Sequence, residues 1–134
     1  MGTYKRFEDL PVWQHSRQFA AKAEQVIENS GIRKSFKLRD QMLGSSGSIM
    51  DNIAEGFERN GNKEFMNFLY YSKGSAGEFR SQLYRALDAN RINESDFDEL
   101  YAQVEAISKE LQLFLNHLHN SELRGVKYTS RGNI

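Results

Sequence analysis

Apolar side chains recur along most of this chain with the 3.6-residue period of amphipathic helices. Four helices are expected, at about residues 10–29, 35–58, 63–89 and 95–123. The connections between them are short, and the one proline, Pro11, falls in the first turn of a helix, where its missing N–H costs little. The pattern predicts an all-α fold, an antiparallel up-down-up-down four-helix bundle.

Two glycine-rich stretches, 44–48 and 72–77, lie inside the second and third predicted helices. If these helices fold back on each other, Ser46 lies level with Gly74. A glycine within a helix costs about 1 kcal/mol relative to alanine, and a close approach of the two backbones would offset that cost. We therefore predict close packing here and strong destabilisation by Gly47→Leu or Gly74→Leu. The alternative is that the glycines merely loosen both helices.

The length of 134 residues fits one domain, expected at residues 7–123, followed by an aperiodic and mobile C-terminal tail at 124–134. The absence of cysteine excludes disulfides and cysteine nucleophiles. The N-terminus shows no apolar signal region, and no apolar run approaches the roughly 20 residues that span a bilayer. We expect a cytoplasmic protein with no membrane partner.

The formal net charge is zero, with 18 basic and 18 acidic residues. This balance argues against a dedicated nucleic-acid binder, which usually carries a clear basic excess. The charges are spread unevenly, however, because residues 95–123 hold six acids against a single base, Lys109. The remainder of the chain is therefore modestly basic.

One basic cluster stands out between the first and second predicted helices. It contains Arg33, Lys34, Lys37 and Arg39, with Phe36 between them. Such a cluster can contact phosphates, which makes these four cations the candidate nucleic-acid contacts. A solvated loop leading into a helix is the equally open alternative.

The end of the second predicted helix carries an unusual set of polar residues: Asp51, Asn52, Glu55 and Arg59. Glu55 and Arg59 are four apart with the acid first, the better order for an ion pair within a helix. Asp51 and Glu55 share a face and could serve acid–base chemistry. The Glu-x-x-His motif of di-metal bundles does not occur in the sequence. We therefore interpret Asn52, Glu55 and Arg59 as a structural polar cluster, and expect no catalytic residue, metal or cofactor.

The third predicted helix has apolar groups outside its main stripe, notably Met66, Tyr70 and Tyr84. A helix with two apolar faces often has one neighbour inside the protomer and another outside it. These residues are therefore candidates for an oligomer interface. Ordinary surface tyrosines are the alternative.

Four segments occur in an order that suggests a family: FEDLPVWQ at 7–14, SIMDNIAEGFER at 48–59, KEFMNFL at 63–69 and GSAGE at 74–78. Together they resemble the bacterial four-helix-bundle family of 23S rRNA intervening-sequence proteins, which is related to the accessory variability proteins of diversity-generating retroelements. The resemblance covers about residues 7–118.

The resemblance implies a ring-like homopentamer without enzymatic activity. In the retroelement relatives, a basic surface binds nucleic acid and a reverse transcriptase. The present sequence departs from the family pattern because Leu43 and Gly44 stand where two arginines are usual. That departure and the neutral charge both weigh against nucleic-acid binding, but leave the apolar pattern intact.

Two main hypotheses for the function follow. The first is a non-enzymatic, homo-oligomeric scaffold that associates with RNA or an RNA-processing protein. The second is a protein–protein interaction module without nucleic-acid binding, using the tyrosine-bearing face or the surface beside Gly44 and Gly47. A third, an enzyme using Asp51 and Glu55, would need both carboxylates in an open pocket with a bound ligand or metal.

Overall fold

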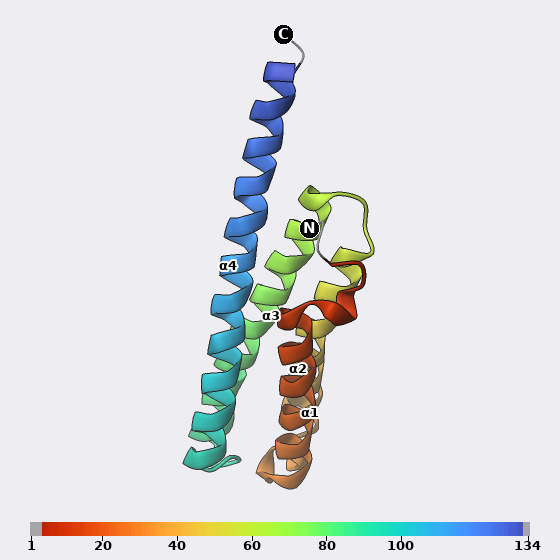
Figure 1. Ribbon diagram of the computed structural model, residues 1–134. Coiled ribbons are helices and arrows are strands. Elements are labelled where there is room, and N and C mark those ends of the chain that lie inside the picture. Colours follow the sequence, from red (N-terminus) through yellow and green to blue (C-terminus); the bar gives the residue numbers. More distant parts are fainter. Residues whose placement is uncertain (1–3, 133–134) are drawn as a thin grey trace.

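The computed structural model describes residues 4–132, with side chains through residue 121. Four α-helices follow one another: α1 (Pro11–Asn29), α2 (Phe36–Phe57), α3 (Asn62–Asp88) and α4 (Glu94–Gly132). Two short 3-10 helices, η1 (Phe7–Asp9) and η2 (Gly31–Lys34), precede α1 and α2 respectively. The α-helices run alternately up and down side by side, and the described residues contain no strand (Figure 1). The predicted all-α, antiparallel four-helix bundle is confirmed.

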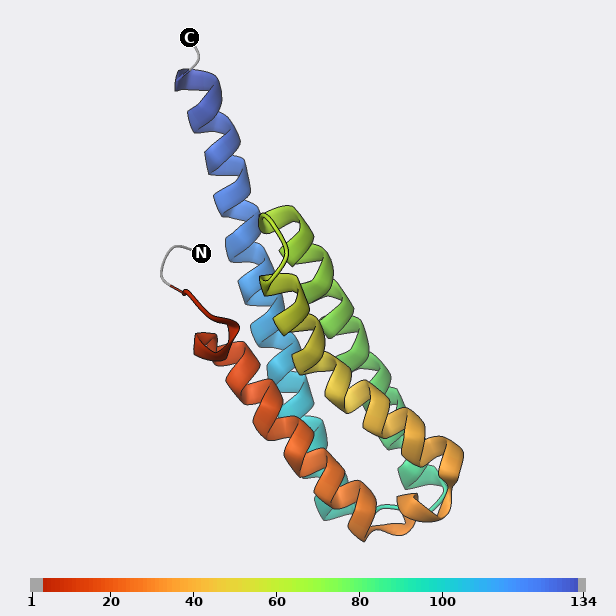
Figure 2. The same ribbon diagram turned by 90° about the vertical axis from the view of Figure 1, so that its right-hand side faces the viewer.

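Helix α4 is longer than the sequence pattern predicted. It continues to Gly132, whereas the apolar period predicted an end near residue 123. Figures 1 and 2 show its last turns projecting beyond the other three helices. No proline follows Pro11 in the sequence, so no residue removes a backbone donor from this stretch. The mobility predicted for residues 124–134 stays a prediction, and residues 133 and 134 lie outside the described part.

One apolar core runs along the bundle axis and takes side chains from all four helices. Within it, the buried ring of Phe19 in α1 meets that of Phe79 in α3 edge to face, with ring centroids 5.0 Å apart. Burial of one such large side chain contributes about 1.5–3 kcal/mol relative to leaving it exposed. The core therefore explains why the apolar period alone predicts the fold.

Helices α2 and α3 are joined by two buried hydrogen bonds from serine side chains. The Ser72 hydroxyl donates to the backbone carbonyl of Ile49 at 2.8 Å, and the Ser45 hydroxyl donates to Oε1 of Gln82 at 2.6 Å. The first of these bonds brings the stretches 44–48 and 72–77 to about the same height, as the sequence predicted.

The predicted glycine contact between these stretches is nevertheless wrong. A Cβ added at Gly44, Gly47 or Gly74 would find no atom of another described element within 4 Å. Each residue turns a helix by about 100°, so Ser45 and Ser72 carry the buried face and these glycines point outward. The expected clash of Gly47→Leu or Gly74→Leu inside the protomer therefore has no structural basis.

Candidate functional site

The close approach of α2 and α3 lies at Gly56, near the turn between them. A Cβ added there would lie 2.5 Å from Cβ of Phe68 and 3.1 Å from Cδ1 of Phe65. No side chain fits in this space unless α3 shifts. The glycine within the stretch 48–59 therefore has a packing role, and the turn that follows uses Gly61 in a left-handed conformation with φ of 88°.

The predicted polar cluster divides into two parts. Nη2 of Arg59 donates to Oε1 of Glu55 at 3.0 Å, so the predicted ion pair forms, although both side chains are about half exposed. The Asn52 amide instead donates to the carbonyl of Ser48 in its own helix, at 2.9 Å. Asn52 therefore does not join Glu55 and Arg59 in one cluster.

Arg59 connects the end of α2 to α3 through an aromatic contact. Its guanidinium carbon lies 5.2 Å from the ring centroid of Phe68, a cation–π arrangement worth about 0.5–1 kcal/mol at an exposed site. Phe68 is also the residue whose side chain can approach α2 closely because position 56 is a glycine. The stretch 48–59 thus stabilises the turn between α2 and α3. Asp51 and Glu55 are both exposed to solvent and form no enclosed acid–base pair.

The basic cluster lies at the opposite end of the bundle, on η2 and the start of α2. Arg33, Lys34 and Lys37 are exposed and make no ion pair with any described residue. Arg39 differs, because its guanidinium contacts Glu28 at 2.8 Å and Asp40 at 3.3 Å. Three of the four predicted cations therefore remain open to a ligand.

The sequence analysis did not predict how strongly the Phe36 side chain in this cluster is exposed to solvent. It is the first residue of α2, and it is 80% exposed. A signal was available, since Phe36 is out of phase with the buried Leu38 and Met42 of the same helix.

The three candidate interface residues on α3 have different surroundings. Met66 is half-buried and packs against the core, whereas Tyr70 is 55% exposed. Tyr84 packs against Phe97 and Tyr101 of α4, with ring centroids 5.2 and 5.8 Å away. Hydrogen bonding with Tyr101 raises the pKa of Tyr84 above its ordinary value. Tyr70 is thus the most available of the three for a partner.

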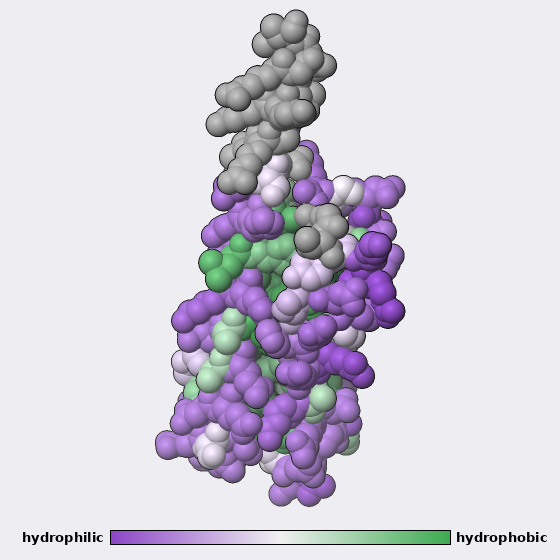
Figure 3. Space-filling view, viewed as in Figure 1, coloured by the Kyte–Doolittle hydropathy of each residue, from purple (hydrophilic) through white to green (hydrophobic). Residues whose placement is uncertain are grey.

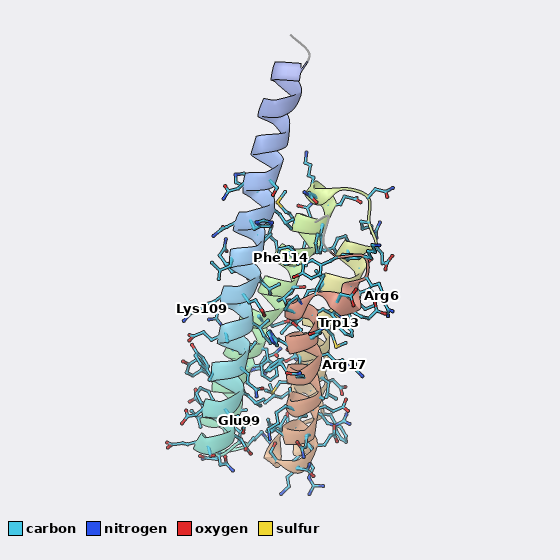
Figure 4. All side chains as sticks on the ribbon, in the orientation of Figure 1. Arg6, Trp13, Arg17, Glu99, Lys109 and Phe114 are labelled. Carbon is cyan, nitrogen blue, oxygen red and sulfur yellow. The ribbon has the colours of Figure 1, made fainter. Side chains whose placement is uncertain are left out.

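A groove that the sequence did not predict runs between α1 and α4. Its volume is about 570 Å³, Phe19 and Ile107 contribute to its lining, and its rim includes Leu113, which is 69% exposed. Figure 3 shows apolar surface between the polar outer faces of the two helices, and Figure 4 shows Trp13 and Lys109 on opposite sides of this seam. Nδ1 of His15 and Oε1 of Glu110 lie 2.9 Å apart across it.

Two further properties bear on the kind of protein. Among the described residues, no group of three or more His, Asp or Glu side chains is placed to hold a metal ion. Within the described residues, no helix is both long and apolar enough to cross a membrane.

The fold and these surfaces define a class of protein: a four-helix bundle whose candidate binding features lie on its outer surface. The chain belongs to the family of 23S rRNA-intervening sequence proteins, whose family model matches residues 8–113. No curated protein matches the chain.

A solved structure supports the fold. The chain resembles a protein of unknown function from the S23 ribosomal protein family of Bacteroides thetaiotaomicron, with a TM-score of 0.71 and 23% identity. The match covers 78% of this chain and 97% of that one. Neither this description nor that of the family names a reaction.

Proposed function

We propose that this chain is a non-enzymatic, cytoplasmic scaffold that self-associates through α2 and α3 and contacts RNA with one end of its bundle. The observation that carries the proposal is the outward placement of its unusual residues. Open glycines lie on α2 and α3, an exposed tyrosine lies one helical turn from one of them, and cations without an ion pair to a described residue lie at one end.

Self-association is supported by glycines that no close contact among the described residues requires. Gly44, Gly47 and Gly74 cost about 1 kcal/mol each relative to alanine, and no neighbouring side chain occupies the space that they leave. A helix of a second copy can approach a glycine backbone closely, as small residues allow between membrane helices. Tyr70, one helical turn before Gly74, supplies a large contact surface.

The mass of the assembly in solution tests this part. We expect light scattering after size exclusion to give a multiple of the protomer mass, and the family resemblance favours five copies. Gly74→Leu should lower that mass while the helical circular-dichroism signal is kept. The matched control is Ala102→Leu, at an exposed site of α4. A monomeric wild type, or a Gly74→Leu variant that keeps its full mass, contradicts this interface.

RNA association is supported by Arg33, Lys34 and Lys37, which are exposed together at one end of the bundle. Each cation that neutralises a phosphate releases counterions, so the affinity should fall steeply with salt. We expect filter binding to retain structured RNA at low salt and to lose it when all three cations are changed to Gln. Lys109→Gln, on α4, is the control. If the wild type retains no structured RNA on the filter at low salt, the RNA part of the proposal is wrong.

A protein-interaction module without RNA is the second candidate. It is favoured by the adjacent exposed side chains of Tyr70 and Tyr71 on α3. Affinity capture from the native host, with and without nuclease treatment, separates the two candidates. Partners that are lost with nuclease favour RNA association, and partners that persist and require Tyr70 favour the module.

A further inference from the structure

Phe36 begins α2 at the tip of the bundle, and no contact in the core explains its position. It is 80% exposed, whereas the other large apolar residues of this connection, Ile32 and Leu38, are 0% and 5% exposed. An aromatic ring held in water does not gain the stabilisation that its burial would contribute. The core does not use this ring, which leaves it available to a ligand.

The backbone just before Phe36 is fixed by hydrogen bonds. The Ser30 hydroxyl accepts a hydrogen bond from the N–H of Ile32 at 3.2 Å, and Arg91 donates to the carbonyl of Gly31 at 3.2 Å. Together with the burial of Ile32, these bonds fix η2 against the connection between α3 and α4. A fixed platform binds a ligand with a smaller loss of conformational entropy than a mobile loop does.

The charged residues closest to Phe36 in the chain are positive, and the nearest acid, Asp40 one helical turn further on, is paired with Arg39. Arg33 and Lys34 precede it and Lys37 follows it, and none of the three forms an ion pair with a described residue. Arg39 is the exception, since Glu28 and Asp40 hold its guanidinium. One exposed aromatic ring is thus flanked by three free cations within five positions of the chain.

We propose that Phe36, Arg33, Lys34 and Lys37 form a site for single-stranded nucleic acid. An unpaired base stacks on the Phe36 ring, and the three cations contact the neighbouring phosphates. This inference rests on the RNA contact of the proposed function and adds two features: selection for unpaired nucleotides, and a role for Phe36 in place of Arg39. A base inside a duplex is already stacked on both faces and cannot reach the ring.

The surroundings of Phe36 fit a base better than the other ligands of a basic surface. Stable lipid anchoring requires a broad apolar face or a second anchor, and Phe36 is the one large apolar side chain exposed in residues 30–41. A protein hot spot needs a rim that excludes water, and cations surround this ring instead. A single base needs one flat ring and nearby positive charge, which this tip offers.

Fluorescence anisotropy of the full chain at low salt tests the site. The probes are a labelled oligouridine and an oligouridine–oligoadenine duplex of equal length. We expect the wild type to prefer the single strand, and Phe36→Ala to lower the single-strand affinity about tenfold, within the range seen for loss of one stacked base. Phe36→Trp should keep the affinity. Leu113→Ala, which removes another exposed apolar side chain, on α4, is the matched control.

The salt dependence separates stacking from charge. Lys34→Gln and Lys37→Gln should each flatten the slope of log affinity against log salt by about 0.7, the value for one phosphate contact on a single strand. Phe36→Ala should lower affinity without changing that slope. In Phe36→Trp, oligouridine should quench the new tryptophan, while the buried Trp13 of the wild type gives the baseline.

Each contrary result has a distinct meaning. If Phe36→Ala binds oligouridine as the wild type does while the lysine variants weaken binding, the stacking site is wrong and RNA association stands. If the wild type binds neither probe but filters retain its complex with structured RNA, the single-strand site is wrong and RNA association stands. If it binds neither the probes nor structured RNA, both are wrong. If it instead binds phosphatidylglycerol vesicles in a Phe36-dependent way and no oligonucleotide, the tip is a lipid site and the inference is overturned.

Discussion

Two helix–helix interfaces of this bundle, which we call seams, are built differently: the one between α2 and α3 and the one between α1 and α4. The same amphipathic pattern underlies both. Between α2 and α3, small residues allow the helices to approach, and the side chains of Ser45 and Ser72 make buried hydrogen bonds across the seam. Between α1 and α4, the polar contacts are the partly exposed pairs His15–Glu110 and Lys22–Glu99, beside a groove of about 570 Å³. The difference shows that side-chain size and burial, more than apolar period, determine how tightly two helices pack.

The comparison predicts where substitutions cost most, and Gly56→Ala should cost most of all. The new Cβ would lie 2.5 Å from Cβ of Phe68, so α3 must move. We expect a loss of about 3 kcal/mol in the free energy of unfolding, at the upper end of typical overpacking costs, measured by urea denaturation.

Gly44→Ala is the matched control, because its Cβ would meet no neighbouring element. Equal unfolding midpoints for Gly56→Ala and Gly44→Ala would show that the α2–α3 interface can accommodate an added methyl group. The proposed difference in packing between the two seams would then be wrong.

The next effect should come from Ser45→Ala. This change leaves Oε1 of Gln82, a residue that is 4% exposed, without the donor that it has now. The expected cost is about 1–2 kcal/mol, again from urea denaturation. Ser45→Ala combined with Gln82→Met should recover most of it, because both polar partners are then gone. A double variant that is no more stable than Ser45→Ala would contradict this account.

Gly47→Ala should act in the opposite direction. It adds a methyl group in open space and removes the cost of a glycine within a helix, so we expect the protomer to gain about 0.5–1 kcal/mol. The measurement is a thermal melt at high dilution, where association between copies contributes least. A marked destabilisation would instead revive the glycine contact that the sequence suggested.

The smallest effect is expected in the α1–α4 seam. Glu110→Gln removes the charge that faces His15 across a partly exposed contact of 2.9 Å. Exposed pairs of this kind contribute about 0.2–1 kcal/mol, so the unfolding midpoint should shift little. A loss as large as that of Ser45→Ala would mean that both seams stabilise the bundle equally.

The sequence predicted the helices and the Glu55–Arg59 pair because both depend on residues close together in the chain. Its errors arise where direction or distance in space matters. Composition shows that residues 44–48 are small, but one helical step decides that Ser45 faces inward and Gly44 outward. Likewise, the sequence could not show that Arg39 pairs with Glu28, because Glu28 lies on another helix.

The candidate site shows the same limit. The cations at 33–37 were found from their spacing, whereas the groove beside Leu113 depends on how α1 and α4 pack. The packing role of Gly56 was also out of reach, because it depends on the position of Phe68 on the next helix.

The separation in sequence of the contacts across each seam has a consequence for the order of folding. Ser72 and Ile49 are 23 positions apart, whereas His15 and Glu110 are 95 apart. Closing the longer loop costs more chain entropy, so we expect the α2–α3 hairpin to form early and α1 to dock on α4 last. Native-state hydrogen exchange should then show α1 amides opening at a lower free energy than those of α2 and α3. During synthesis, we therefore expect the apolar side chains of α1, α2 and α3 that α4 covers in the bundle to stay exposed until α4 has left the ribosome.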